Sequence, residues 1–164
     1  MNKERLLRGV VITAGALMLA IIAGCASAPA AGDAGAEPVR IRLRAENAEM
    51  HSNGALVFEN PNIGYWETTE DRITWDADVE VGGTYMVSLY AACDPEFPGS
   101  IVDVTIDGQT VQVEIPDTGG WQEYRTLEAG TVELSPGSYE LVVQASHVDN
   151  RFVANLSDVN LVLQ

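Results

Sequence analysis

The chain has 164 residues, with 24 acidic and 9 basic side chains and a formal net charge of -15 at neutral pH. A surface this acidic repels phosphate backbones and anionic lipid headgroups, so nucleic acid is not expected as a partner. The acidic residues are interleaved with regularly spaced apolar ones, which indicates a soluble folded surface rather than a disordered chain.

The N-terminus has the layout of a secretory signal. Basic residues within the first eight positions precede an apolar run over residues 9–24, which is shorter than the roughly 20 residues of a membrane-spanning helix. The run ends in Ile22-Ala23-Gly24-Cys25, which resembles a bacterial lipobox, where the signal is cleaved before a cysteine that becomes lipid-modified. An ordinary signal cleaved elsewhere and an uncleaved anchor are the alternatives. Ala26, rather than an acidic residue, follows the cysteine, which under enterobacteria-like sorting favours the outer membrane over the inner one.

Composition divides the chain into three parts. Residues 1–24 are expected to be the signal peptide, and residues 25–38 the lipidated Cys25 with a flexible linker rich in Ala, Gly, Ser and Pro. Residues 39–164 are then the folded part, of a size that holds one core without disulfide bonds. With Cys25 carrying lipid, Cys93 has no partner for an internal disulfide.

Apolar residues alternate with polar ones at period two through most of the folded part, which predicts strands with one face on a core. Gly82-Gly83, Asp107-Gly108 and Pro136-Gly137 supply turns between them, and Asp-Gly is a strong hairpin signal. The strands are expected near residues 41–45, 73–81, 85–93, 102–106, 111–115, 132–134, 139–145 and 159–163, with a further short one at 54–58. The segment around Pro61 and Gly64 is expected to be a turn.

Eight or nine short strands without a helical repeat predict an all-β fold, an antiparallel two-sheet jelly-roll sandwich. Arg40, Arg42 and Arg44 share the outward side of the first strand. Cys93 has the parity of the apolar positions before it, so it is expected to be a small buried hydrophobe rather than a reactive thiol.

The sequence offers little support for catalysis. Carboxylates such as Asp76, Asp78 and Glu114 occupy outward, solvent-facing strand positions. His51 and His147 belong to no metal-ligand spacing, and no nucleophile turn or phosphate-binding glycine loop is present. We therefore expect no catalytic residue and no enzyme.

Glycan binding is better supported. Sugar rings present an apolar face edged by hydroxyls, so they are bound by exposed aromatic rings with a side-chain amide nearby. Three places supply these groups: Tyr65 and Trp66 in a loop, Trp121 after Gly119-Gly120, and Asn155 at the start of the last strand.

Six motifs occur in the order seen in carbohydrate-binding module families 6 and 35, which the whole folded part resembles. These are Ala45-Glu46, Asn62-Ile63-Gly64-Tyr65, Gly83-Thr84-Tyr85, Ile106-Asp107-Gly108, Thr118-Gly119-Gly120-Trp121 and Asn155-Leu156. The Gly64-Tyr65-Trp66 loop and the Tyr90-Ala91-Ala92-Cys93 strand are similar to a branch of these galactose-binding-like sandwiches that is appended to bacterial alpha-L-fucosidases and sulfatases.

The resemblance implies a binding cleft. Tyr65 and Trp121 would sandwich a sugar ring, Asn155 would hydrogen-bond its hydroxyls, and Trp66 would be an extra wall. The alternative is that one or more of these aromatics closes the open end of the sandwich as core, which is the expected role of Trp66 in particular.

The resemblance also implies a structural calcium that this chain lacks the ligands to hold. Family members bind it through a Glu-Ala-Glu strand start and an aspartate after the Asn-Leu pair, whereas Arg44 and Ser157 stand at two of those places. Each change removes an anionic oxygen that a hard cation needs, so we expect no metal site or other cofactor. Arg44 is expected to pair with Glu46 or Asp158 instead.

Three functions compete at this point. The first is a non-catalytic, membrane-anchored lipoprotein of the bacterial cell envelope that binds a polysaccharide or other glycan. The second is a structural or protein-interaction sandwich without a sugar site, with an envelope protein as its partner. The third is a small glycan-active hydrolase, which would need a convergent pair of titratable groups.

Overall fold

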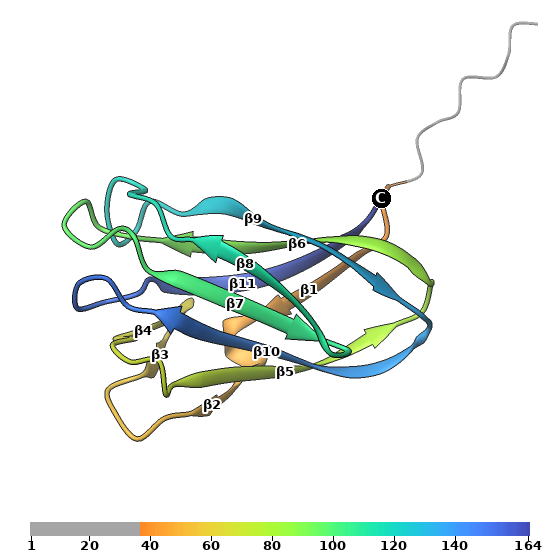
Figure 1. The fold of residues 1–164 in the computed structure, drawn as a ribbon, viewed down its shortest axis with the longest axis horizontal. Coiled ribbons are helices and arrows are strands. Elements are labelled where there is room, and N and C mark those ends of the chain that lie inside the picture. The colour runs from red at the N-terminus through yellow and green to blue at the C-terminus, as the bar shows by residue number, and fades with distance from the viewer. Residues whose placement is uncertain (1–36) are drawn as a thin grey trace, which may run out of the picture. The chain divides into compact units, whose positions relative to one another are not determined.

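A computed structural model describes residues 37–164, so the expected signal peptide, Cys25 and most of the 25–38 linker lie outside the described residues. The described chain is an antiparallel two-sheet β-sandwich, as the alternation predicted (Figure 1). Its elements are β1 (Arg40–Arg44), the 3₁₀ turn η1 (Ala45–Asn47), β2 (Glu49–His51), β3 (Val57–Glu59), β4 (Asn62–Gly64), β5 (Arg72–Val79), β6 (Gly83–Ala92), β7 (Ile101–Ile106), β8 (Gln109–Glu114), β9 (Arg125–Leu134), β10 (Gly137–His147) and β11 (Asn155–Leu163).

One sheet has the order β3-β4-β11-β6-β9, with β1 also paired to β11, and the other has the order β2-β5-β10-β7-β8. Strand β11 is central to the first sheet, because β4 pairs with its start at Leu156 and β1 pairs with its remainder from Asp158 to Val162. Its first residues therefore lie beside the end of β4, and its later residues beside β1.

The core is formed by the inward-facing residues of both sheets, as period-two strands require. On β5, Ile73, Trp75 and Ala77 are buried while Asp76 and Asp78 are exposed. Cys93 is buried as expected, and burial raises the pKa of its thiol to about 11, which keeps it in the unreactive protonated form.

The structure differs from the sequence prediction at the short and irregular strands. The segment expected to be a turn around Pro61 contains β4, whose three residues are buried. Strand β9 begins at Arg125, seven residues before the expected start, and β1 ends at Arg44 because Ala45 begins η1. These segments are too short or too mixed in polarity to show alternation, so only pairing with neighbouring strands defines them.

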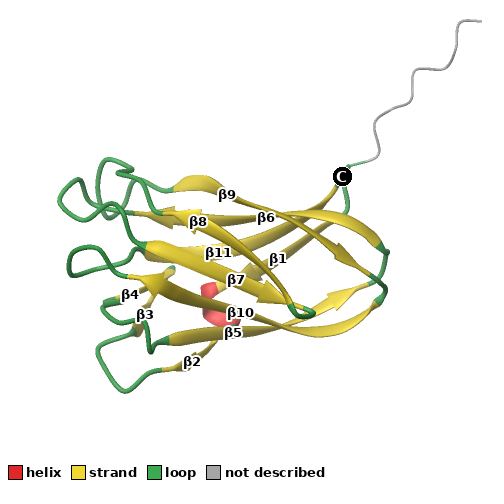
Figure 2. Ribbon diagram, in the orientation of Figure 1, coloured by secondary structure: helices red, strands yellow, loops and turns green. Residues whose placement is uncertain are grey.

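The turns and loops lie at the two opposite ends of the sandwich (Figure 2). Asp107 and Gly108 both have positive φ, 49° and 70°, which is the geometry of a two-residue hairpin turn between β7 and β8. The end of β11 lies beside the chain entering β1, because the Leu163 N–H donates to the Val39 carbonyl at 3.0 Å. The loops that follow β4, β6, β8 and β10 gather at the opposite end.

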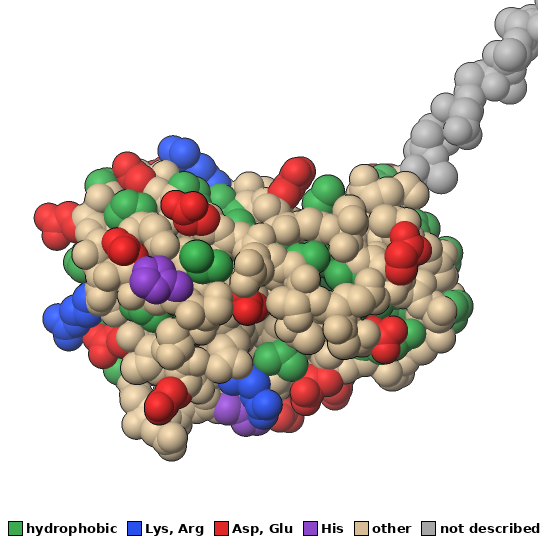
Figure 3. Space-filling view, viewed as in Figure 1, with side chains coloured by type: hydrophobic (Ala, Val, Ile, Leu, Met, Phe, Trp, Pro, Cys, Tyr) green, Lys and Arg blue, Asp and Glu red, His purple; other side chains and the backbone are tan. Residues whose placement is uncertain are grey.

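Acidic side chains are spread over the face seen in Figure 3, where basic ones are few. Among residues 37–164, no helix is long and apolar enough to span a membrane.

Candidate functional site

A pocket of about 340 Å³ lies at the loop end of the sandwich. Its lining comes from four segments that are distant in sequence: β3, the loop after β4, the β8–β9 loop, and the chain entering β11. The lining residues are Glu59, Tyr65, Trp66, Trp121, Gln122, Phe152, Ala154 and Asn155. All four residues expected from the sequence to bind sugar are among them.

Pairing of β4 with β11 brings Tyr65 next to Asn155. Ile63 of β4 lies opposite Leu156, so Gly64 and Tyr65 pass the Asn155 side chain. A Cβ on Gly64 would lie 2.8 Å from the Asn155 Oδ1, which is closer than van der Waals contact allows. Gly64 thus permits the amide to sit against the backbone at this point.

Tyr65 has a strained backbone and an exposed ring. Its φ is 54°, in the left-handed region that costs a residue with a Cβ about 1–3 kcal/mol. The side chain is 50% exposed, so burial of the ring does not offset this cost. Such strain at an exposed aromatic is typical of a functional position.

The loop that carries Trp121 is fastened to the sandwich at its base. The Thr118 hydroxyl accepts the Cys93 N–H at 2.7 Å and donates to the Cys93 carbonyl at 3.0 Å. Gly119 and Gly120 follow with φ values of 108° and 153°, which turn the chain toward Trp121.

Hydrogen bonds also join the segments around the pocket to one another. The Asn155 Nδ2 donates to the Trp121 carbonyl at 2.9 Å, and the Val153 N–H donates to the Trp66 carbonyl at 2.8 Å. These hydrogen bonds hold the three segments against one another, as a preorganised site requires.

The Trp121 ring belongs to an aromatic cluster with Phe97 and Phe152. It lies 5.5 Å from the Phe97 ring at an interplanar angle of 31°, and 5.8 Å from Phe152 at 89°. Phe97 and Phe152 contact each other edge to face at 5.3 Å. The cluster fixes the orientation of Trp121 and covers part of its surface, but the ring stays half-buried and still lines the pocket.

Trp66 has a different position from the other three predicted residues. It is 1% exposed and belongs to the core, and its Nε1 donates to the Thr68 carbonyl at 3.2 Å. This placement is the core alternative stated for it above. Its ring supports the pocket from beneath and has no free face on which a sugar could stack.

Sequence reasoning did not identify Glu59, Gln122 and Phe152, which also line the pocket, or Phe97 behind Trp121. Gln122 and Phe152 lie within one to three residues of Trp121 and Asn155, so proximity to predicted residues was a usable signal for them. Glu59 and Phe97 were missed for different reasons: Glu59 is on β3, which pairs with β4, and Phe97 reaches the site through ring contacts of the β6–β7 loop with Trp121 and Phe152.

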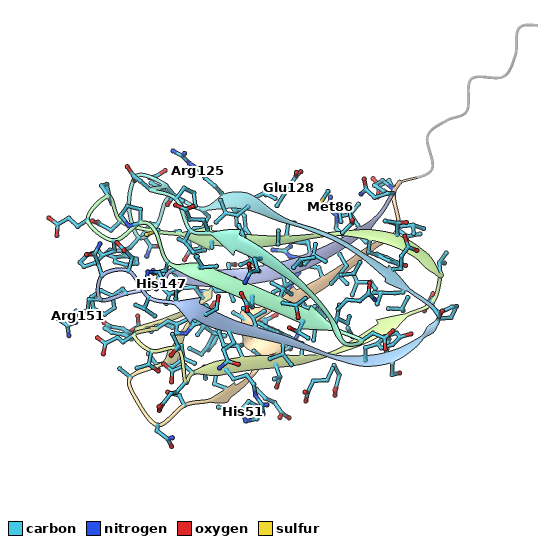
Figure 4. All side chains as sticks on the ribbon, in the orientation of Figure 1. His51, Met86, Arg125, Glu128, His147 and Arg151 are labelled. Atoms are coloured by element: carbon cyan, nitrogen blue, oxygen red, sulfur yellow. The ribbon has the colours of Figure 1, made fainter. Side chains whose placement is uncertain are left out.

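Neither histidine is among the pocket-lining residues, and Figure 4 shows them at two separate places, His51 at the end of β2 and His147 at the end of β10. The His51 Nε2 is 3.1 Å from the Thr74 hydroxyl, and the His147 Nε2 is 3.7 Å from an Asp149 carboxylate oxygen.

The residues at the position of the family's calcium form an ion-pair cluster. Asp158 is 2% exposed, and both of its oxygens accept hydrogen bonds from Arg42, Nε to Oδ1 at 2.7 Å and Nη2 to Oδ2 at 3.0 Å. The Ser157 hydroxyl donates to the same Oδ2 at 2.8 Å. Arg44 pairs with Glu46 at 3.2 Å, as one of the two expectations had it, whereas Arg42 and not Arg44 holds Asp158.

The positive charges of Arg42 and Arg44 thus balance the negative charges of Asp158 and Glu46. A hard cation would need excess negative charge at this place. Burial alone would raise the pKa of Asp158, but the hydrogen bonds from Arg42 and Ser157 and the Arg42 charge hold it below its usual value. Within residues 37–164, no group of three or more His, Cys, Asp or Glu side chains is arranged to hold a metal.

Comparison with family models decides what kind of domain this is. The model of carbohydrate-binding module family 6 matches residues 32–162. The chain belongs to this family. Modules of the family are non-catalytic domains that bind carbohydrate and are often appended to glycoside hydrolases. No curated protein matches the chain.

Solved structures share its fold. A family 6 module of Cellvibrio mixtus lichenase 5A in complex with cellotriose is 20% identical, with a TM-score of 0.55 over 76% of this chain and 97% of that one. A family 35 module from Cellvibrio japonicus is 16% identical, with a TM-score of 0.58 over 76% and 93% of the two chains. An exo-β-1,3-galactanase from Phanerochaete chrysosporium with galactose is 20% identical, with a TM-score of 0.59 over 75% of this chain. The family 6 module described here spans 29% of that enzyme.

Proposed function

We propose that this family 6 module binds a glycan in the loop-end pocket, with the sugar ring against Tyr65 and the open side of Trp121. The observation that carries the proposal is the convergence of two ligand-accessible aromatics and one amide, from three separate segments, on one pocket. Asn155 is oriented by its bond to the Trp121 carbonyl and would accept a hydrogen bond from a sugar hydroxyl through Oδ1.

Weak binding is expected for a single sugar unit. The pocket is open and its rings are partly covered by each other, so a ligand buries little apolar area there. Hydroxyl contacts in the pocket replace hydrogen bonds to water and add about 0.5–1.5 kcal/mol each. Affinity for a polysaccharide would then come from several modules or from an attached enzyme.

Tryptophan fluorescence tests the proposal, because Trp121 is the half-exposed tryptophan while Trp66 and Trp75 are buried. A glycan panel screened against the protein is expected to give a shift or quenching with some members. Trp121→Ala is expected to remove the signal, and Tyr65→Ala and Asn155→Ala to weaken binding, measured by calorimetry or NMR.

Tyr90→Ala is the matched control for Tyr65→Ala, since Tyr90 is an exposed tyrosine on β6 outside the pocket lining. Binding that is lost equally in both variants, or that survives Trp121→Ala, would place the glycan elsewhere. A panel without any binder would favour the structural or protein-interaction alternative.

We further propose that the module is an envelope lipoprotein held by lipid on Cys25. The chain enters the sandwich at β1, at the end opposite the loops of the pocket (Figure 1), so a tether there would leave the pocket accessible. Membrane fractionation of the full chain and of Cys25→Ala tests this. The expected result is that the variant leaves the membrane fraction, and persistence of the variant in membranes would contradict lipid anchoring.

An anchored module could act together with glycan-degrading enzymes of the envelope. Fucosidases and sulfatases are candidates, because the branch of galactose-binding-like sandwiches that this sequence resembles is appended to such enzymes. The module would hold a polysaccharide at the cell surface for enzymes made from other chains. Co-purification of such an enzyme after envelope cross-linking is the expected observation.

A further inference from the structure

The charged group in the pocket lining is negative. Glu59, on the edge strand β3, contributes an exposed carboxylate to the lining, and none of the eight lining residues is Lys, Arg or His. The rest of the molecule adds to this field, since the whole chain carries a formal net charge of -15. A ligand entering the pocket therefore meets a negative potential.

Two hydrogen-bond acceptors in the pocket are open, the Asn155 Oδ1 and the Glu59 carboxylate. The Asn155 Nδ2 gives one of its two N–H groups to the Trp121 carbonyl, and the Trp66 Nε1 donates to the Thr68 carbonyl, while the second Asn155 N–H and the Trp121 Nε1 donate to no residue between 37 and 164. The Asn155 Oδ1 and the Glu59 carboxylate accept no hydrogen bond from any residue between 37 and 164. The acceptors thus remain open to a ligand, and the Tyr65 hydroxyl and Gln122 amide can serve in either role.

The Arg151 side chain lies beside Phe152 of the pocket lining, and it is already paired with an acidic residue. The Arg151 guanidinium stands 4.8 Å from the centre of the Phe152 ring, and its Nε is 3.2 Å from the Glu67 Oε1. It projects outward at the loop end and is not part of the lining (Figure 4). The Arg151–Glu67 pair has no net charge, so it does not reverse the sign set by Glu59.

We infer that the pocket selects sugars that carry hydrogen-bond donors and no negative charge, namely neutral and amino sugars, and disfavours uronic acids and sulfated sugars. This inference rests on the proposed function. A hydroxyl or an ammonium group donates to the open acceptors, whereas a carboxylate or sulfate offers only acceptors and is repelled by Glu59. An amine gains an additional ion pair with that carboxylate.

Nine methyl glycosides test the inference: the neutral, 2-amino and uronate forms of glucose, galactose and mannose, titrated at pH 6 and low salt with NMR detection of the Trp121 indole. Within any stereochemical series that binds, the amino form is expected to bind most tightly, the neutral form less tightly and the uronate most weakly. The amino form should gain about two- to five-fold over the neutral one, as for an exposed ion pair, and the gain should shrink as NaCl is added.

Glu59→Gln removes the charge and keeps the size of the side chain, and it is expected to abolish the amino preference and reduce the uronate penalty. Glu128→Gln is the matched control, because Glu128 is an exposed glutamate on β9 outside the pocket lining (Figure 4). It makes the same change in net charge and should leave the order intact.

The outcomes separate the two proposals. A uronate that binds as well as its neutral counterpart, or an order unchanged in Glu59→Gln, overturns the selectivity while glycan binding stands. An equal loss of the amino preference in Glu128→Gln also overturns it, because the whole-molecule charge would then be responsible. If no series perturbs Trp121, and a wider neutral glycan panel also fails, the proposed function falls and the selectivity falls with it.

Discussion

Asn155 and Asp158 lie three residues apart on β11, and the polar groups around them are used in opposite ways. Asp158 is buried, and its oxygens accept three hydrogen bonds from Arg42 and Ser157. Asn155 is half-buried, with its Nδ2 bound to the Trp121 carbonyl while its Oδ1 accepts no hydrogen bond from residues 37–164.

The difference separates a structural cluster from a binding site. Buried polar groups must be satisfied within the protein because each unpaired one costs about 1–3 kcal/mol, and at Asp158 both carboxylate oxygens are bound by Arg42 or Ser157. At Asn155 one half of the amide fixes the orientation and the other half stays open at the pocket. The two regions should therefore respond differently to substitution, in stability around Asp158 and in glycan binding around Asn155.

Trp66 gives the largest expected effect, because it lines the pocket but belongs to the core. Trp66→Ala is expected to cost about 3–5 kcal/mol of unfolding free energy, since it leaves a cavity beneath the pocket. Urea unfolding measures this, with the half-buried Trp121→Ala as the comparison, for which a smaller cost and a larger loss of glycan binding are expected. A Trp66→Ala protein as stable as Trp121→Ala would contradict the assignment of Trp66 to the core.

Much of the fold could be predicted from the sequence, because strands such as β7 bury every second residue and alternation of apolar and polar residues reports this directly. Strand β4 could not be predicted, since its three residues are all buried and show no alternation. Alternation along the first strand correctly predicted that Arg40, Arg42 and Arg44 share one face. It could not predict which acidic residue each arginine pairs with. Asp158 lies directly opposite Arg44 in the ladder, yet the long Arg42 side chain reaches it diagonally.

The pocket residues that could be predicted from the sequence are those that belong to local turn or strand-start motifs. Tyr65, Trp121 and Asn155 follow turn or strand-start signals, and the structure brings all three to one pocket. The cluster of Phe97 and Phe152 behind Trp121 depends on how two loops pack against each other, and no local pattern records such packing. The charge of the pocket escaped prediction because Glu59 is on the short strand β3, whose pairing with β4 no alternation reveals.

The Asp158 cluster supplies the next largest effect. Arg42→Met keeps the apolar stem but removes the partner of a buried carboxylate, so a loss of about 1–3 kcal/mol is expected. Arg44→Met is the matched control, since Arg44 pairs with the exposed Glu46, and it should cost about 0–1 kcal/mol. Calcium or a chelator is expected to leave the melting temperature of the wild-type protein unchanged. Clear stabilisation by calcium would show that the cluster opens to accept the ion.

Acid should weaken this cluster within a defined pH window. Because the pKa of Asp158 is lower in the folded than in the unfolded state, the cluster stabilises the protein above the unfolded value of about 3.9, and this contribution is lost as pH falls through the lower folded pKa. Asp158→Asn is expected to lose less stability than the wild type on acidification from pH 5 to pH 2. Parallel urea unfolding curves of the two proteins measure the difference, and identical slopes with pH would contradict the role given to Asp158.

Tyr65 gives the smallest expected change in stability and separates backbone strain from ligand contact. Glycine adopts a φ of 54° without the steric cost that a Cβ imposes, so Tyr65→Gly is expected to stay within about 1 kcal/mol of the wild type in stability. It should also be more stable than Tyr65→Ala, which keeps the strain, although both variants lose the ring and should bind glycan equally poorly. Asp107→Gly is the control, because aspartate at a φ of 49° tolerates this conformation better and gains less from the change. A Tyr65→Gly protein that is stable but has lost glycan binding would mean that the strained ring at the pocket serves the ligand. A variant that is much less stable would instead mean that Tyr65, like Asp158, mainly stabilises the fold.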